Sequence, residues 1–378
     1  MRLRHPDGST LHLCYCSNVH PADDLEGVAV QLERYAARVR ERLDVPVLGV
    51  GLWVGAPAVA DAAAADRLRA QLDRLGLEVV TLNGFPYRGF HDPVVKRQVY
   101  RPNWAAGARL DYTVALAGLL ARLLPDDVTE GSISTLPLGW RSECNVADRA
   151  VCRHALERLA VALAALEDET GKRIRIALEP EPGCTIETIA QASAFLAGLA
   201  PEWIGVCVDA CHLAVQFEAP REAVARLAQD GVAVVKAQVS SALRVPHPRG
   251  EDEVGAFAEP RFLHQTRELV DGRVVGVDDL AAALGGELPG DSEWRVHFHV
   301  PVHADGPRTT QTELSATLAA LVGGSAAVTT HLEVETYTWT VLPEAQRPRD
   351  DEGLVQGLAR ELEWTRDRLV ELGLEEET

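Results

Sequence analysis

Two glutamates directly follow an apolar run in the segment IALEPEPGC, residues 176–184. Side chains two residues apart on a strand share a face, so Glu179 and Glu181 point in the same direction where the strand ends. One carboxylate at a strand end is ordinary. Two carboxylates on one face require a cation, a proton or a substrate hydroxyl as a partner.

Other apolar runs also end in residues that bind metals or substrates. These residues are Asp209 and His212 in IGVCVDACH, Gln238 and Ser240 in VAVVKAQVSS, His331, Glu333 and Glu335 in VTTHLEVETY, and His297, His299 and His303 in WRVHFHVPVH. A single acid is usually solvated, and a single histidine is usually a hydrogen-bonded core residue. Several carboxylates gathered in one apolar barrel mouth would need a cation, because unpaired buried charge is costly.

A divalent ion at such a site would have a specific chemistry. Carboxylate oxygens with one imidazole or amide suit Mn²⁺ or Mg²⁺ better than a structural zinc ion, with Zn²⁺ or Co²⁺ as alternatives. The ion would bind adjacent oxygens of a sugar, polyol or hydroxyketone and polarise the carbonyl. The neighbouring C–H then becomes acidic enough for a carboxylate base.

The elements that must position these residues alternate between strands and helices. Nine apolar runs are predicted as strands, at 11–20, 47–54, 78–85, 131–140, 174–182, 204–212, 232–241, 294–303 and 328–337. Eight strand–helix pairs closing into a (β/α)8 TIM barrel, an α/β fold, would gather the polar strand ends at one mouth. A doubly wound open sheet is the alternative, but no glycine-rich phosphate loop follows the first strand.

The ninth strand indicates an insertion of about residues 242–293 between the seventh and eighth barrel strands. Within it, RFLHQTRELVDGRVVGVDDL predicts a hairpin that turns at Asp271 and Gly272. Either residues 232–241 or residues 294–303 supply the seventh barrel strand. The long aromatic and basic stretch 84–108 is a candidate lid over the mouth.

Composition excludes several classes of protein. The chain has 378 residues and a net charge of −19, which disfavours nucleic acid and anionic membranes as partners. No apolar run approaches the roughly 20 residues of a membrane span, and no secretory signal precedes the first strand. We expect one cytoplasmic TIM-barrel domain over residues 1–378 that binds a small-molecule substrate. A homo-oligomer is compatible with the sequence.

Three motifs in order, ALEPEP, VDACH and LEVETY, resemble the xylose-isomerase-like TIM barrels, the sugar phosphate isomerase and epimerase superfamily, over about residues 10–345. The resemblance implies a divalent metal held by Glu179, Asp209, a histidine and Glu335. It also implies that Glu179 and Glu335 transfer protons on opposite faces of the substrate. His212 would be a substrate contact.

One position departs from the pattern of this family. Where the epimerases carry a metal-binding histidine on the seventh strand, this chain has Gln238 in KAQVS. Either Gln238 binds the metal directly or His299 takes its place. The remaining predicted substrate contacts are Glu181, Glu333, Ser240, His20, Asn83 and Trp140.

Three longer stretches, CYCSNVHP, FHDPVVKRQVY and VHFHVPVH, resemble the metabolite-traffic proteins called EboE. That likeness implies a role in moving or tailoring a secondary metabolite rather than in simple sugar isomerisation. A non-catalytic metabolite-binding protein on the same barrel is therefore an alternative. Two further alternatives are an aldolase that forms a Schiff base on Lys236 and a hydrolase built on His297, His299 and His303.

Overall fold

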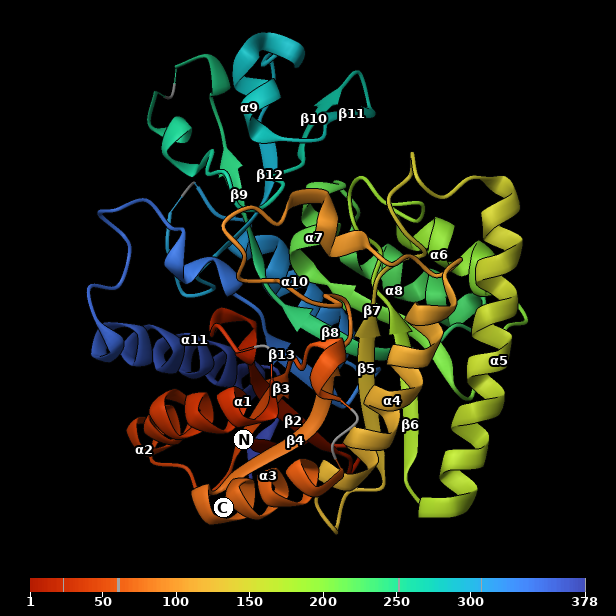
Figure 1. Ribbon diagram of the computed structural model, residues 1–378. Coiled ribbons are helices and arrows are strands. Elements are labelled where there is room, and N and C mark those ends of the chain that lie inside the picture. The colour runs from red at the N-terminus through yellow and green to blue at the C-terminus, as the bar shows by residue number, and fades with distance from the viewer. Residues whose placement is uncertain (23, 60–61, 251, 307, 378) are drawn as a thin grey trace.

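Eight parallel strands close into a barrel at the centre of the computed structural model, which describes residues 1–377 except 23, 60–61, 251 and 307 (Figure 1). In barrel order the strands are β2 (Thr10–Cys16), β3 (Leu48–Leu52), β4 (Leu77–Asn83), β5 (Glu130–Thr135), β6 (Arg173–Leu178), β7 (Ile204–Asp209), β8 (Val234–Val239) and β13 (His331–Val334). β13 pairs with both β8 and β2, which closes the barrel. The predicted TIM barrel is confirmed, and the open-sheet alternative is wrong.

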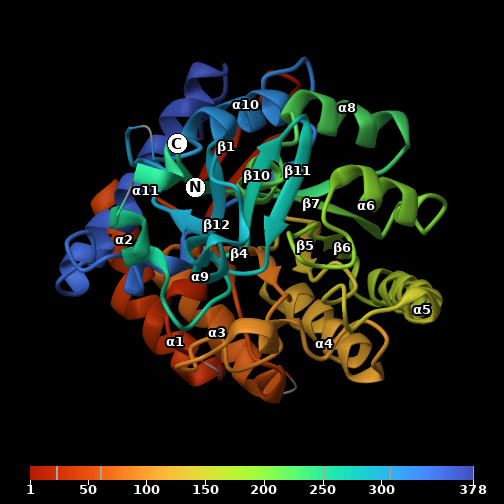
Figure 2. The same cartoon turned by 90° about the horizontal axis from the view of Figure 1, so that it is seen from above.

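Helices surround the barrel, as the view along its axis shows (Figure 2). They are α1 (Leu25–Gln31), α2 (Ala37–Leu43), α3 (Ala62–Leu75), α4 (Gly107–Leu123), α5 (Val146–Thr170), α6 (Ile189–Leu196), α7 (Ala210–Val215), α8 (Pro220–Gln229), α9 (Leu280–Ala282), α10 (Gln311–Val322) and α11 (Asp351–Glu371). A π-helical turn, Leu32–Ala36, joins α1 to α2. Among the helices of the described residues, none has the length and hydrophobicity that crossing a bilayer demands.

The seventh barrel strand is β8, and the predicted strand at 294–303 belongs to a second sheet. This inserted sheet is antiparallel, in the order β11-β10-β12-β9. Its strands are β9 (Ser241–Val245), β10 (Thr266–Val270), β11 (Arg273–Val277) and β12 (Trp294–Val300). The hairpin turns at Asp271 and Gly272, whose φ angles are 49° and 73°. That the whole chain is one domain stays a prediction.

The inserted sheet lies above the carboxyl ends of the barrel strands (Figures 1 and 2). At the opposite end, β1 (Arg2–Arg4) pairs antiparallel with β2 and with β14 (Glu375–Glu376). The barrel therefore has one end closed by its terminal strands and one end covered by the insertion.

The barrel interior contains a charged layer rather than a purely apolar one. Lys236 Nζ lies 2.5 Å from Glu333 Oε2, and both side chains are fully buried. The same ammonium donates to Asn83 Oδ1 at 2.8 Å. Gly51 on β3 makes room for this layer, because a Cβ at that position would lie 2.1 Å from the Glu333 carboxylate.

We predict that Gly51→Ala lowers the free energy of unfolding by about 1–3 kcal/mol, since its methyl group overlaps a carboxylate that Lys236 holds in place. The matched control is Gly118→Ala in α4, whose Cβ would meet nothing within 4 Å. That change should raise the free energy of unfolding by up to about 1 kcal/mol, because alanine favours helices. Urea denaturation measures both, and equal stability of the two variants would contradict this role of Gly51.

Candidate functional site

A cavity, partly open to solvent, lies at the carboxyl ends of the barrel strands. Its polar wall includes Asn18, Asn83, Glu179, Glu181, His212, His297, His299 and Glu335. The loop after β4 and the insertion meet above it, where the backbone N–H groups of Val95 and Lys96 donate to the carbonyl of Arg261, both at 2.8 Å. The predicted lid stretch therefore forms part of the cover.

Three carboxylates converge at the barrel mouth, and two of them, Glu179 and Glu335, line this cavity. Glu179, Asp209 and Glu335 each offer an oxygen within 4.8 Å of the others, and all three side chains are buried. Burial, reinforced by repulsion from neighbouring carboxylates, raises the pKa of Glu179 and of Glu335 well above the ordinary range. The cluster is therefore stable only when it shares protons or holds a cation.

Asp209 is oriented by the helix that follows it. As the N-cap of α7, its Oδ1 accepts from the His212 backbone N–H at 2.7 Å and from Ser240 Oγ at 2.9 Å. Its Oδ2 is buried and has no hydrogen-bond partner among the described residues. One oxygen thus fixes the side chain, and the other is free to bind.

Two further side chains present a free acceptor. His299 Nδ1 donates to the Glu335 carbonyl at 2.6 Å, so its Nε2 carries the lone pair. Gln238 Nε2 donates to Asn83 Oδ1 at 3.2 Å, which leaves its Oε1 as the acceptor. Neither His299 Nε2 nor Gln238 Oε1 has a hydrogen-bond partner in the described part of the chain. These orphaned buried atoms and the carboxylates fit a divalent cation.

Four of the predicted substrate contacts lie outside the cavity wall as far as the described residues define it: His20, Trp140, Ser240 and Glu333. The His20 ring stacks on Tyr35, with ring centroids 4.2 Å apart. Trp140 packs behind the wall against Tyr100, with ring centroids 4.9 Å apart. Ser240 orients Asp209, and Glu333 pairs with Lys236, so these two act on neighbours rather than on a ligand in the cavity.

Lys236 is poorly suited to form a Schiff base. Although burial alone would lower its pKa, the Glu333 carboxylate more than compensates and raises it. A nucleophilic lysine must lose its proton, and this ammonium is held in a fully buried ion pair. The aldolase alternative therefore has no support in this geometry.

His303 lies apart from His297 and His299, which weakens the hydrolase alternative. Its ring stacks at 6.3 Å on Trp339, and it lines a different surface depression from the barrel mouth.

Sequence reasoning missed the residues that reach the mouth from the loop after β4 and from the insertion. Tyr100 donates to Glu181 Oε1 at 2.6 Å, and Gln265 donates to the same oxygen at 3.4 Å. Burial nevertheless raises the pKa of Glu181 to about 8. The aromatic character of residues 84–108 pointed to a lid, but no pattern in the sequence identified Tyr100 or Gln265 as partners of Glu181.

A family model described as "Xylose isomerase-like TIM barrel" matches residues 47–287. No curated protein matches the chain as a relative. A D-psicose 3-epimerase from Clostridium cellulolyticum H10, solved with D-tagatose, is 12% identical, with coverage of 95% of this chain and 99% of that one and a TM-score of 0.53.

Two metal-containing structures are also similar. A xylose isomerase-like TIM barrel protein from Mycobacterium smegmatis in complex with magnesium is 14% identical, with coverage of 97% and 94% and a TM-score of 0.50. The IolI protein with a bound zinc atom is 12% identical, with coverage of 96% and 99% and a TM-score of 0.50. At these identities the likeness shows the shared barrel fold.

A buried glutamate on α11 anchors the segment that carries Glu335. Glu361 Oε1 accepts from the backbone N–H of Val302 at 3.0 Å and from Thr336 Oγ1 at 2.6 Å, and its Oε2 accepts from Trp339 Nε1 at 2.9 Å. Burial raises its pKa from the ordinary 4.5 to about 7, although all three donors oppose that rise.

This shift predicts a pH dependence of stability. Below about pH 4.5 Glu361 is neutral in both states. Between about pH 4.5 and 7, Glu361 ionises in the unfolded state but stays protonated in the folded state. Its contribution therefore lowers the free energy of unfolding by about 3 kcal/mol over this range. Glu361→Gln cannot ionise and should remove that part of the decline. Urea unfolding from pH 4.5 to 8 measures the difference, with exposed Glu375→Gln as the control. Parallel curves for wild type and Glu361→Gln would contradict the assignment.

Proposed function

The chain belongs to the xylose isomerase-like TIM barrel family, and from this membership and its buried carboxylates we propose that it is a divalent-metal-dependent isomerase or epimerase. Its substrate would be a sugar-, polyol- or hydroxyketone-like metabolite. The observation that carries the proposal is the convergence of Glu179, Asp209 and Glu335 at the barrel mouth. Similar barrels include a ketose 3-epimerase and proteins that hold magnesium or zinc.

The metal ligands we propose are Glu179, Asp209, Glu335 and His299, with Gln238 as the alternative to the histidine. His299 is favoured because its nitrogen lies within 4.8 Å of ligand atoms of Asp209 and His212. Mn²⁺ or Mg²⁺ suits this oxygen-rich set best, with Zn²⁺ or Co²⁺ as alternatives. When bound, the ion would polarise a substrate carbonyl and acidify the adjacent C–H.

The chain's own part in the reaction is to move a proton. Glu179 and Glu335 would accept and return the proton on opposite faces of the substrate. Asn18 Nδ2 donates to Glu335 Oε1 at 3.2 Å and orients that carboxylate. The covering loop and insertion would exclude water while the proton is transferred.

The outer wall of the cavity suits an apolar group on the substrate. The apolar and aromatic side chains of this outer wall, called the collar below, include Phe85, Phe90, Val99, Phe262, Leu263 and Tyr337. They come from the loop after β4, from the insertion and from the segment after β13. A substrate with its oxygens at the carboxylates and an apolar ring or chain against this collar would use both surfaces. Such a substrate agrees better with the proposed tailoring of a secondary metabolite than with a plain sugar.

The second candidate function is binding without chemistry, as in a metabolite-traffic protein of the EboE type. Gln238 favours it, because a neutral amide at a barrel ligand position binds a metal weakly. A ligand that binds and is recovered unchanged, with no exchange of its carbon-bound hydrogen, would support this candidate over the enzyme. The cytoplasmic location and the homo-oligomer stay predictions.

We predict that Glu179→Gln and Glu335→Gln each lower the rate of proton exchange by about 10²–10⁴-fold, because each removes a proton-transfer group. The measurement is deuterium uptake from solvent into hydroxyketones in the presence of Mn²⁺, followed by NMR. The matched control is Glu78→Gln, a buried glutamate that pairs with His12 at 2.8 Å on the amino-terminal half of the barrel. Retention of full exchange in both mouth variants would overturn the enzymatic proposal.

The collar generates a separate prediction. Phe262→Ser should weaken binding of a phenyl-substituted hydroxyketone by about tenfold or more, since a phenyl contact contributes 1–3 kcal/mol. Binding of an unsubstituted triose ketone should change little. Val274→Ser, at an exposed position of β11 in the same insertion, is the control. Calorimetric titration measures all three proteins, and equal losses for both ligands would contradict the collar.

A further inference from the structure

Two cysteine side chains lie in contact at the start of α5. Cys144 directly precedes Asn145, the N-cap residue of this helix, and Cys152 lies at the end of its second turn. Their sulfur atoms are 4.0 Å apart, and both thiols are free and buried. Because a disulfide bond measures about 2.05 Å, side-chain rotations that bring the sulfurs about 2 Å closer would join them.

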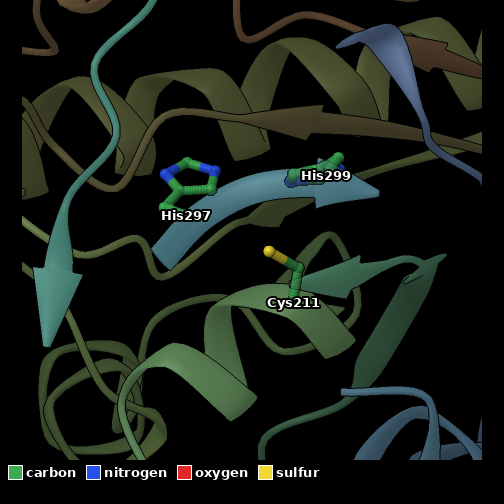
Figure 3. A group of neighbouring side chains, drawn as sticks. All are labelled: Cys211, His297 and His299. Carbon is green, nitrogen blue, oxygen red and sulfur yellow. The ribbon is translucent and has the colours of Figure 1, made fainter. Parts of the chain in front are cut away.

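Cys211 shows how the other cysteines differ from this pair. Among the described residues, no other two cysteines are in hydrogen-bond contact through their sulfur atoms. Figure 3 shows the sulfur of Cys211 directed toward β12, where its neighbours are His297 and His299, with ligand atoms within 4.8 Å of one another. Burial also raises the pKa of the Cys211 thiol well above its ordinary value. Cys211 is therefore a protonated thiol without a second thiol to join.

The two thiols of the pair differ in how close they lie to solvent. Cys144 is 3% exposed, and the residues next to it in the chain, Ser142 and Asn145 among them, are exposed. Cys152 is 0% exposed, because it faces the core from within the helix. A small oxidant therefore reaches Cys144 first, and Cys152 is positioned to react with the product.

Cys144 is also the more reactive sulfur of the two. A hydrogen bond from the Cys152 thiol, with a smaller contribution from the Thr185 hydroxyl, lowers the pKa of Cys144, although burial opposes this shift. The same contact and burial together raise the pKa of Cys152. Because the thiolate rather than the thiol attacks an oxidant, exposure and acidity select the same residue as the attacking group.

We propose that Cys144 and Cys152 form a redox-active pair, which a hydroperoxide oxidises to a disulfide within the chain. The Cys144 sulfur attacks one peroxide oxygen, the O–O bond breaks, and the other oxygen leaves with the thiol proton as an alcohol, or as water from hydrogen peroxide. The Cys152 sulfur then attacks the sulfenic acid on Cys144. The S–S bond forms, the S–O bond breaks, and the hydroxyl leaves with the Cys152 proton as water. The two sulfurs lose two electrons to the peroxide, and a dithiol reverses the reaction.

The pair lies beside contacts that support the cover of the mouth. Glu143, the neighbour of Cys144, accepts from Arg101 at 2.9 and 2.8 Å, and its backbone carbonyl accepts from Asn103 Nδ2 at 3.2 Å. Arg101 and Asn103 belong to the loop after β4. A disulfide at Cys144 would fasten this junction to α5, so we expect oxidation to slow the opening of residues 100–106. The proposal does not depend on isomerase activity.

Peptide mass spectrometry of the full chain detects the bond directly. The reduced protein is treated with a small excess of hydrogen peroxide, blocked with N-ethylmaleimide and cleaved with trypsin. Cleavage after Arg149 separates the two cysteines, so a disulfide appears as a cross-linked pair of peptides, two hydrogens lighter than their sum. We expect this pair to form about tenfold or more faster than any modification of the other cysteines, and dithiothreitol to remove it.

Two variants test the order of the steps. In Cys152→Ser the sulfenic acid on Cys144 has no thiol to react with, so dimedone should label Cys144. Cys144→Ser should leave Cys152 unlabelled. The wild-type chain unfolded in urea is the control, and there the preference for this pair should disappear.

The wild-type measurement decides the proposal without relying on any variant's folding. Oxidation of Cys144 and Cys152 no faster than that of the other cysteines in the folded protein would overturn it. Labelling of Cys152 in Cys144→Ser that equals labelling of Cys144 in Cys152→Ser would contradict the role of Cys144 as the attacking sulfur. Amide hydrogen exchange before and after oxidation tests the link to the loop. Exchange slowed about threefold or more at residues 100–106 would support that link, and unchanged exchange would refute it.

Discussion

Unpaired charge at the barrel mouth is the constraint on which the rest of this structure depends. Two ionised carboxylates 4.8 Å apart would repel by about 3 kcal/mol at an effective dielectric constant of 20, and Glu179, Asp209 and Glu335 form three pairs within that distance. Lys236 relieves this repulsion only in part, because its ammonium pairs with Glu333. Ser240 holds Asp209 by Oδ1, and the Glu335 carbonyl holds His299 by Nδ1. Asp209 Oδ2 and His299 Nε2 therefore remain free acceptors.

The deeper layer of the barrel shows how the chain neutralises a buried acid when no outside ion is involved. There, Lys236 pairs with Glu333, and both also contact Asn83. The mouth has no equivalent among the described residues: Lys96 reaches the cavity, but it pairs with Asp279 of the insertion. The buried charges of the deeper layer are therefore balanced within the protein, whereas those of the mouth require a proton or a metal ion.

The strand ends and the order of the carboxylates could be predicted from the sequence because both are local properties. A period of two places Glu179 at the end of β6, and barrel closure brings it to Asp209 and Glu335. Sheet membership is not local, so the runs at 232–241 and 294–303 looked equivalent until their pairing was known. The partners of Glu181 could not be predicted for the same reason, since Tyr100 and Gln265 lie 81 and 84 residues away in sequence.

The insertion does more than cover the mouth, because it supplies the imidazoles that β8 lacks. β12 carries a register shift between Val296 and His299, and bulges of this kind re-aim side chains beside functional sites. His297 and His299 are two residues apart on that strand, and both line the cavity. If barrel carboxylates and β12 nitrogens bind one cation together, docking of the insertion strengthens the binding of that ion. The bound ion then stabilises the docked insertion by the same free energy. For such a cation, binding and docking of the insertion would be one linked equilibrium.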